Sequence, residues 1–188
     1  MSDGRPRITG GALRGRALAV PPGDTVRPMR SRVRQSLFNI LGDRVRGARV
    51  LDVFAGSGAI ACEALSRGAR EAVAIETSPL VLITLRHNIK ELALGVQLTV
   101  LETNAYEYRP EEPFDGIFLD PPFPDYESEE RSPWALLASL AQSGLAEGGW
   151  IGMEMPRGEE VREIEGLELM TSRSYGDTAL ALWEKNTP

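Results

Sequence analysis

The sequence predicts an α/β fold built on a mostly parallel, seven-stranded sheet. Short apolar runs alternate along the chain with amphipathic stretches of about ten residues, the pattern of strands joined by helices that cover both faces of a sheet. The last two apolar runs are separated only by Gly176-Asp177, so we expect them to form an antiparallel pair at the edge of the sheet. At 188 residues, the chain is long enough for one domain of this kind.

The N-terminal part of the chain has a different pattern from the rest. Residues 7–21 predict a small β-hairpin, in which Gly10-Gly11 permits a sharp turn. Residues 30–42 predict an amphipathic helix, because their apolar positions fall on one face. We therefore expect an Arg-rich N-terminal extension over residues 1–28 and the main domain over residues 29–188.

The remaining elements alternate in the order that a parallel sheet requires. Helices are predicted where apolar residues recur every three or four positions, and buried strands where they run together. The predicted helices cover 59–67, 79–92 and 132–143. The predicted strands cover 50–54, 71–76, 96–101, 115–119, 150–155, 165–174 and 178–184. The loop at 124–133 is long enough to act as a lid over a site.

Composition excludes several classes of protein. Cys62 is the only cysteine and His87 the only histidine, so an intrachain disulfide and a zinc cluster are excluded. No apolar run approaches the roughly 20 residues of a membrane span, and residues 1–7 lack the apolar core of a signal peptide. We therefore expect a cytoplasmic protein that uses no metal and does not enter a membrane.

Charge is distributed unevenly along the chain. Residues 1–50 contain eleven Arg and three Asp, a net charge of +8, whereas the rest contains 10 basic and 24 acidic residues, a net charge of −14. Arginine suits phosphate because its planar guanidinium can bond two oxygens at once. An acidic protein with an Arg-rich N-terminus is typical of one that binds a polyanion mainly through that end.

A glycine-containing turn follows the first strand of the predicted sheet. Gly56 and Gly58 come shortly after Asp52-Val53-Phe54, where the strand passes into a helix. Glycines let the backbone turn tightly and let a ligand approach it closely. Glu76 ends the next strand, and a carboxylate there can accept hydrogen bonds from both ribose hydroxyls of a nucleoside. The sequence therefore predicts a nucleoside cofactor at the carboxyl ends of these two strands.

Two cofactors fit this turn, and charge favours one of them. The spacing Gly56-x-Gly58-x-x-Ala61 with Glu76 also satisfies a dinucleotide fingerprint, so a nicotinamide-dependent oxidoreductase is an alternative. Asp52, however, lies four residues before Gly56, where its carboxylate would repel a pyrophosphate. The same carboxylate suits S-adenosylmethionine, which carries a sulfonium and an ammonium group. We therefore predict S-adenosylmethionine as the cofactor.

A second motif, Asp120-Pro121-Pro122-Phe123, follows the fourth predicted strand. Consecutive prolines stiffen the loop and fix its backbone carbonyls. The Asp120 carboxylate and the Pro121 carbonyl can both accept hydrogen bonds from one aromatic amine, whose nitrogen is otherwise a poor nucleophile because its lone pair is shared with the ring. Phe123 offers a face on which a base can stack. The motif predicts methyl transfer to an exocyclic amine, with Asp120, Pro121, Pro122 and Phe123 as the catalytic residues.

With these motifs, the chain resembles the RsmD-type family of bacterial ribosomal RNA methyltransferases over nearly its whole length. The resemblance implies a Rossmann-like, class I S-adenosylmethionine-dependent methyltransferase fold. It also implies methylation of the exocyclic N2 of a guanine in small-subunit (16S) ribosomal RNA. The segments that carry it are Arg7-Ile8-Thr9-Gly10-Gly11, Arg14-Gly15-Arg16, Arg27-Pro28, Arg32-Val33-Arg34, Leu37-Phe38-Asn39, 52–58, 63–69, Glu76, Asn104-Ala105 and 120–123.

The resemblance implies roles for individual residues as well. The cofactor contacts would come from Asp52, Phe54, Gly56, Gly58, Glu76, Asn104 and Ala105, with Asn104 near the adenine. The RNA contacts would come from Arg7, Arg14, Arg16, Arg27, Arg30, Arg32 and Arg34. In one departure, Met29-Arg30-Ser31 stands where the family usually has two Thr and an Asp, and Arg30 adds a candidate phosphate contact there.

Other functions remain open on the sequence. One alternative is methylation of another planar amine by the same chemistry, either adenine N6 in RNA or DNA or a protein glutamine. The glutamine enzymes, however, usually have Asn in place of Asp120. A second alternative is an RNA-binding assembly factor that kept the fold but lost catalysis. A base inside a duplex cannot reach the Asp120 loop, whereas loops of folded RNA present unpaired bases. We expect the partner to be ribosomal RNA, the small ribosomal subunit or its assembly intermediate, and the protein to be a monomer.

Overall fold

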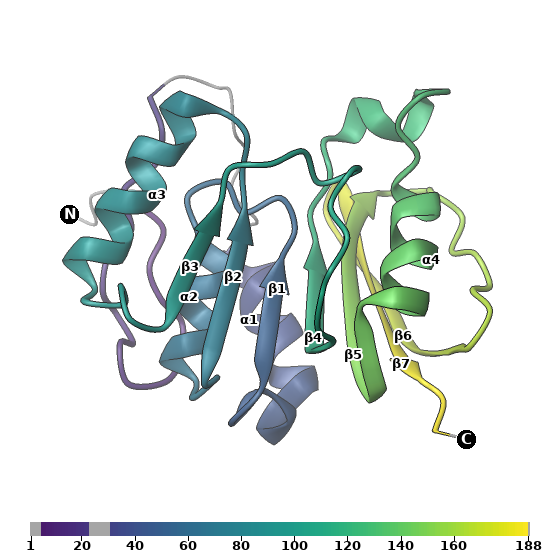
Figure 1. The fold of residues 1–188 in the computed structure, drawn as a ribbon, viewed down its shortest axis with the longest axis horizontal. Coiled ribbons are helices and arrows are strands. Elements are labelled where there is room, and N and C mark those ends of the chain that lie inside the picture. The colour runs from purple at the N-terminus through teal and green to yellow at the C-terminus, as the bar shows by residue number, and fades with distance from the viewer. Residues whose placement is uncertain (1–4, 23–30, 188) are drawn as a thin grey trace.

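The computed structural model describes residues 5–22 and 31–187. In these ranges the strands form a seven-stranded sheet in the order β3-β2-β1-β4-β5-β7-β6 (Figure 1). Neighbours among β1 to β5 are parallel, and β7 is antiparallel to both β5 and β6, which confirms the predicted sheet. The strands are β1 (Arg49–Asp52), β2 (Glu71–Ile75), β3 (Leu98–Leu101), β4 (Phe114–Leu119), β5 (Leu145–Pro156), β6 (Leu167–Tyr175) and β7 (Thr178–Lys185).

The helices also lie where the sequence predicts them. They are α1 (Ser31–Leu41), α2 (Ala59–Ser66), α3 (Pro79–Glu91) and α4 (Pro133–Ser143), with 3₁₀ turns at Gly42–Val45 and Phe123–Glu127. The largest error in the predicted bounds concerns β5, which begins at Leu145 and not at residue 150. Gly148 and Gly149 interrupt the apolar pattern of that strand and so conceal its first half.

Helices cover both faces of the sheet. The core on one face contains Leu37 of α1, Leu65 of α2 and Leu85 of α3. The core on the other face contains Leu137 of α4 together with Trp183 of β7 (Figure 1). Because successive side chains of a strand point to opposite faces, each central strand contributes to both cores.

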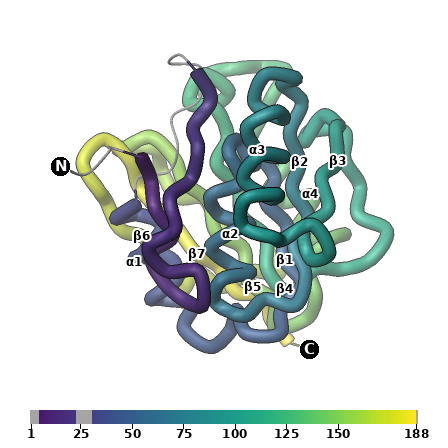
Figure 2. Tube along the Cα trace, turned by 90° about the vertical axis from the view of Figure 1, so that its left-hand side faces the viewer, coloured from purple at the N-terminus to yellow at the C-terminus, as the bar shows by residue number. Residues whose placement is uncertain are grey.

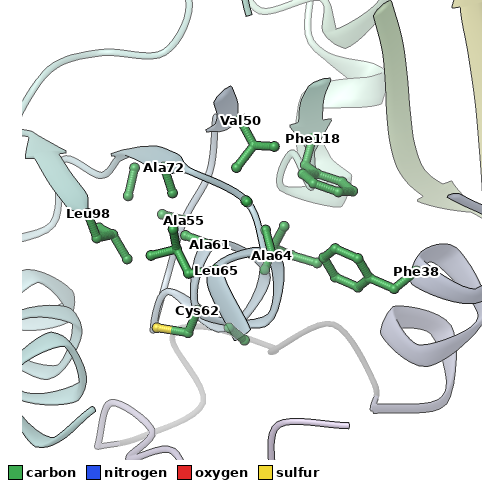
Figure 3. Packing of buried hydrophobic residues seen from close by; sticks show 14 of the residues in the cluster. Phe38, Val50, Ala55, Ala61, Cys62, Ala64, Leu65, Ala72, Leu98 and Phe118 are labelled. Carbon is green, nitrogen blue, oxygen red and sulfur yellow. The ribbon is translucent and has the colours of Figure 1, made fainter. Parts of the chain in front are cut away.

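Small side chains let α2 lie close to the sheet. Ala61 and Ala64 are fully buried, and Figure 3 shows them on α2 near Val50 and Phe118 of the sheet. The Phe38 ring of α1 lies beside them, with its centroid 5.4 Å from that of Phe118. This close packing fixes the start of α2 beside the carboxyl end of β1, where the glycine turn lies.

The N-terminal segment runs along α2 and α3 (Figure 2). The hairpin predicted over residues 7–21 is present in a short form. One antiparallel bridge joins Arg7 and Ala17, and between them the Ile8 N–H donates to the Arg16 carbonyl at 3.0 Å and the Gly15 N–H to the Ile8 carbonyl at 2.9 Å. Ile8 and Leu18 are fully buried and belong to the same core as α1, α2 and α3. The segment is therefore held both by pairing with itself and by its contacts with the domain.

Other backbone donors of this segment bond to the helices of the domain. The Ala12 N–H donates to the Ser66 carbonyl at 2.7 Å, and the Leu13 N–H to the Ser66 hydroxyl at 2.9 Å. Farther along, the Ala19 N–H donates to the Asn88 side chain of α3 at 2.8 Å. Since these N–H groups bond to helices, they do not extend the short hairpin.

One predicted RNA contact is corrected by the structure. The Arg34 side chain is fully buried, and its Nε donates to Glu63 of α2 at 3.2 Å. It also donates to the Arg7 carbonyl, so it joins α1, α2 and the N-terminal segment. The prediction that Arg34 contacts RNA is therefore wrong, because a side chain inside the core cannot reach phosphate.

Candidate active site

A cavity of about 860 Å³ lies at the carboxyl ends of β1, β2 and β4, within the size range of small-molecule sites. Its walls are formed by Val53, Phe54, Gly56, Ile75, Glu76, Thr77, Ser78, Val81, Thr103, Asn104, Ala105, Tyr106, Asp120, Pro121, Pro122, Phe123, Pro124, Asp125, Arg131 and Glu154. The structure thus brings both predicted motifs to one cavity. Among the predicted cofactor and catalytic residues, only Asp52 and Gly58 do not line it.

The glycine turn after β1 forms one wall of the cavity. Gly56 and Gly58 have φ values of +54° and +80°, in the left-handed region that favours glycine. Gly58 lies behind the wall and precedes the first turn of α2. A Cβ on it would come within 2.4 Å of Leu85 Cδ1, so this glycine is required by packing as well as by the turn.

Glu76 closes the same wall from the end of β2. One carboxylate oxygen accepts the Gly56 N–H at 3.1 Å, and the other accepts the N–H groups of Thr77 and Ser78, each at 2.8 Å. These bonds hold the carboxylate against the glycine turn. A carboxylate has about four acceptor positions, so one remains for a hydroxyl of a bound ribose.

Asp52 lies beneath the turn and not in the cavity wall. Its side chain is 2% exposed and accepts the Ala61 N–H of α2 at 3.1 Å. Burial raises the pKa of Asp52 to about 7, the bond from Ala61 opposes this shift, and the negative charge of Glu76 adds to it. Asp52 therefore fixes the start of α2, and any effect on a ligand in the cavity would act through its charge.

The opposite side of the cavity contains Asn104 and Ala105. The Asn104 side chain accepts the Tyr106 N–H at 3.1 Å and donates to Glu107 at 2.8 Å. These local bonds shape the turn after β3. Ala105 is buried, and the Tyr106 ring meets Phe54 edge-on at 5.7 Å between centroids. The predicted adenine contact of Asn104 stays a prediction.

The Asp120 loop leaves the end of β4 and enters the 3₁₀ turn Phe123–Glu127. Two tyrosines fasten this region: the Tyr106 hydroxyl donates to Asp125 at 2.8 Å, and the Tyr126 hydroxyl donates to the Glu154 carbonyl at 3.0 Å. Phe123 is half-buried and forms part of the wall. The first part of the predicted lid at 124–133 is therefore anchored to β5 and to the turn after β3.

Three acidic side chains share one face of the sheet near the cavity. Asp52 ends β1, Asp120 directly follows β4 and Glu154 lies on β5, and these three strands are neighbours in the sheet. Register pairs Leu119 with Met153, so the next residues, Asp120 and Glu154, lie side by side. Burial, followed by the charges of Glu154 and Asp52, raises the pKa of Asp120 well above its ordinary value. The described residues include no cluster of His, Cys, Asp and Glu that could hold a metal.

Glu154 is the cavity residue that sequence reasoning missed. It is 4% exposed although it lines the cavity. An acidic residue inside the apolar run 150–155 was the available signal, because a buried carboxylate has a large desolvation cost and is rarely retained without a role. Arg131, at the rim of the cavity, was also missed.

The remaining predicted RNA contacts differ in how much the structure says about them. Arg7, Arg14 and Arg16 lie exposed on the N-terminal segment, as does Arg32 on α1. Arg16 also donates to the Glu91 carbonyl at 2.8 Å, which ties the segment to the end of α3. The predicted contacts at Arg27 and Arg30, and the departure at Met29, lie outside the described residues. No helix in the described part of the chain is long and apolar enough to cross a membrane.

Comparison with known proteins gives a consistent result. A family model described as "Conserved hypothetical protein 95" matches residues 6–184. The chain is 34% identical over 186 residues to "Putative rRNA methyltransferase YlbH" of Bacillus subtilis, which covers 95% of this chain and 98% of that protein. It is 43% identical over 123 residues to "Ribosomal RNA small subunit methyltransferase D" of Escherichia coli, which covers 64% of this chain and 62% of that protein.

A solved structure agrees over almost the full length. The structure titled "Putative methyltransferase yhhF from Escherichia coli" superposes with a TM-score of 0.83 at 35% identity, covering 97% of this chain and 99% of that one. The agreement therefore extends beyond the glycine turn to the N-terminal segment and the final antiparallel strands.

Proposed function

Because this chain belongs to the RsmD-type family and has its methyltransferase fold, we propose that it transfers a methyl group from S-adenosylmethionine to the N2 amine of a guanine in small-subunit ribosomal RNA. One observation carries the proposal. The Asp120-Pro121-Pro122-Phe123 loop and the Gly56–Glu76 wall line the same cavity. An amine held by the loop would therefore face a ligand held by the wall, as transfer between the two requires.

The loop has the groups that activate an aromatic amine. Asp120 and the carbonyl of Pro121 are acceptors for the two N–H groups of one amine, and these bonds draw the nitrogen toward a tetrahedral shape with an available lone pair. The raised pKa of Asp120 makes its carboxylate a stronger proton acceptor than an exposed aspartate. Phe123 would stack on the base and hold its amine toward the cavity.

The cavity also fits the methyl donor. S-adenosylmethionine supplies an electrophilic methyl group on a sulfonium centre. Glu76 would accept a hydrogen bond from a ribose hydroxyl, the Gly56 turn would let the ligand approach the backbone, and Phe54 and Ala105 line the cavity with apolar surface. The nearby charge of Asp52 favours a cationic ligand over a pyrophosphate. In the transfer a bond forms between the amine nitrogen and the methyl carbon as the bond from that carbon to sulfur breaks, which leaves S-adenosylhomocysteine. The amine loses one proton, which Asp120 would accept.

The RNA would approach from the side of the N-terminal segment. Arg7, Arg14 and Arg16 are exposed there, and Arg32 is exposed on α1. These cations match the phosphates of a folded RNA, and their contacts would weaken steeply with salt. The target base would have to be unpaired or turned out of its stack to enter the cavity.

The test is methyl transfer from labelled S-adenosylmethionine to naked ribosomal RNA, isolated small subunits and DNA, followed by nucleoside analysis. The proposal expects N2-methylguanosine in small-subunit RNA. If N6-methyladenosine is found instead, the protein methylates adenine and the proposed function is wrong. If the protein binds NADH tightly and does not bind S-adenosylmethionine, it is an oxidoreductase.

A variant separates an enzyme from an assembly factor. Asp120→Ala should lower the methylation rate by about 10²- to 10⁴-fold while RNA and S-adenosylmethionine binding persist. Asp43→Ala is the matched control, because this aspartate is 98% exposed and lies in the 3₁₀ turn before β1. Equal activity of the two variants would contradict the role of Asp120.

A further inference from the structure

A second buried carboxylate faces the place where the target base would enter. Glu154 comes from β5, lines the cavity and is 4% exposed. Asp120 directly follows β4, whose last residue, Leu119, pairs with Met153, and the two carboxylates are close enough for the charge of Glu154 to raise the pKa of Asp120. The chemistry proposed above uses Asp120 and leaves Glu154 without a task.

The surroundings of Glu154 hold it in place. Its backbone carbonyl accepts the Tyr126 hydroxyl at 3.0 Å, which joins it to the 3₁₀ turn after Phe123. Its strand is paired on both sides, with Met153 beside Leu119 of β4 and Glu154 beside Leu180 of β7. The backbone that carries the carboxylate is therefore fixed, and a carboxylate on a rigid strand can select a ligand by the position of its hydrogen-bond donors.

The pyrimidine edge of guanine matches two neighbouring carboxylates. On this Watson–Crick edge, the N2 amine and the N1–H lie next to each other and are its only two hydrogen-bond donors. With the N2 amine at Asp120 and the Pro121 carbonyl, the N1–H would point to the next acceptor along the sheet. Adenine presents its N6 amine beside an unprotonated N1, which is an acceptor and would be repelled by a carboxylate.

We propose that Glu154 is the specificity-determining residue for guanine, accepting a hydrogen bond from N1–H while Asp120 holds the N2 amine. This inference rests on the proposed function. It goes further, because it assigns the choice between guanine and adenine to one side chain that neither motif contains. The physical basis is that adenine N1 and the Glu154 carboxylate are both acceptors. With adenine bound, the buried carboxylate would make no hydrogen bond to the base, which costs a large free energy.

A change in the substrate tests this without altering the protein. The methylated guanine, once located by fragment analysis, is replaced by 2-aminopurine, which keeps the amine at C2 but has an unprotonated N1. The substituted RNA is used naked or in reconstituted subunits, whichever the wild-type protein methylates. We expect kcat/KM to fall by about 10- to 100-fold, the effect of losing one hydrogen bond to a charged group.

A variant then tests whether Glu154 causes the preference. In Glu154→Gln the amide can donate to an unprotonated N1, so the preference for guanine over 2-aminopurine should shrink by about tenfold or more. Glu160→Gln, an exposed residue just beyond β5, should keep the wild-type preference. The Kd for S-adenosylmethionine should be the same in all three proteins, which also shows that the variants are folded.

Each outcome bears on one of the two claims. If the wild-type protein forms no N2-methylguanosine, the proposed function is wrong and this inference falls with it. If N2-methylguanosine forms but wild-type and Glu154→Gln proteins prefer guanine over 2-aminopurine equally, the function stands and the role of Glu154 is wrong. A weaker Kd for S-adenosylmethionine in Glu154→Gln, with the preference unchanged, would place Glu154 at the cofactor instead.

Discussion

Replacing Glu63 with Ala should remove much of the stability of the fold, because its carboxylate is the centre of a buried ionic cluster. Neither Glu63 nor Arg34 has any exposed side-chain surface, and their Oε2 and Nε atoms are 3.2 Å apart. The other oxygen accepts from Arg67 Nε at 2.8 Å and from the Thr9 hydroxyl at 2.6 Å. The Thr9 N–H donates to Oε2 at 2.8 Å.

The size of the effect follows from what the substitution leaves behind. Without Glu63, the Arg34 guanidinium stays buried and loses the carboxylate that accepts from its Nε, and breaking a buried ion pair in this way typically costs about 3–5 kcal/mol. The free energy of unfolding of a domain is about 5–15 kcal/mol, so about a fifth or more of the stability would be lost. The matched control is Glu102→Ala, because Glu102 and Arg86 form an ion pair in which both side chains are more than half exposed. Such pairs contribute about 1 kcal/mol or less.

The assay is urea unfolding of wild type and both variants, repeated at acid pH. Burial opposes ionisation of Glu63, but hydrogen bonds from Thr9 and Arg67 and the charge of Arg34 outweigh it, so the pKa of Glu63 lies below its ordinary value of 4.5. Its ionised form therefore stabilises the fold fully above that value, and this stability is lost as pH falls through the lower folded pKa. The difference in the free energy of unfolding between wild type and Glu63→Ala should therefore decrease at acid pH. A loss at neutral pH no larger than that of Glu102→Ala would refute the reasoning.

Three further substitutions test other parts of the structure. Replacing Arg14 and Arg16 with Ala should lower the slope of log RNA affinity against log salt by about 0.7–0.9 for each phosphate that is no longer bound, with the affinity for S-adenosylmethionine unchanged; an equal fall in both affinities would contradict it. In Asp52→Asn, which lacks a carboxyl whose folded pKa is about 7, the wild-type loss of stability as pH rises from about 4 to 8 should be reduced by about 2–4 kcal/mol in urea titrations. Gly11→Ala should destabilise by about 1–3 kcal/mol in the same assay, because Gly11 has φ +77° and its Cβ would lie 1.8 Å from the Ser66 carbonyl oxygen; unchanged stability would mean that the segment leaves α2.

The sheet and the two motifs were predictable because their signals are local. A buried parallel strand is an apolar run, and a motif directly after it must lie at the carboxyl edge of the sheet. Gly56 and Asp120 each follow such a run, so their meeting in one cavity needed only the strand order. The start of β5 was missed because Gly148 and Gly149 supply no apolar pattern, although pairing with β4 and β7 makes it a strand.

Arg34 and Glu154 were not predictable by the same reasoning, because a charged residue is exposed far more often than it is buried. Arg34 follows Val33 on the apolar face of α1. Its burial depends on its ion pair with Glu63, which lies on a different helix, α2. Glu154 is buried beside Asp120, which comes from the end of a different strand. In both cases the buried site is formed by residues distant in sequence, so a local pattern does not reveal it.

The position of the exposed arginines relative to the cavity is fixed by the core. The Asn88 amide of α3 donates to the carbonyl of Ala19, in the N-terminal segment, at 3.0 Å and to the carbonyl of Ser57, in the glycine turn, at 2.9 Å. One buried side chain therefore contacts both the segment that carries Arg14 and Arg16 and the turn that shapes the cavity wall. Because Ile8 and Leu18 anchor the same segment in the core, phosphates bound by its arginines would lie at a set distance from the Asp120 loop. A substrate whose phosphates match that distance would bring its unpaired base to the cavity, which favours a folded RNA over a flexible single strand.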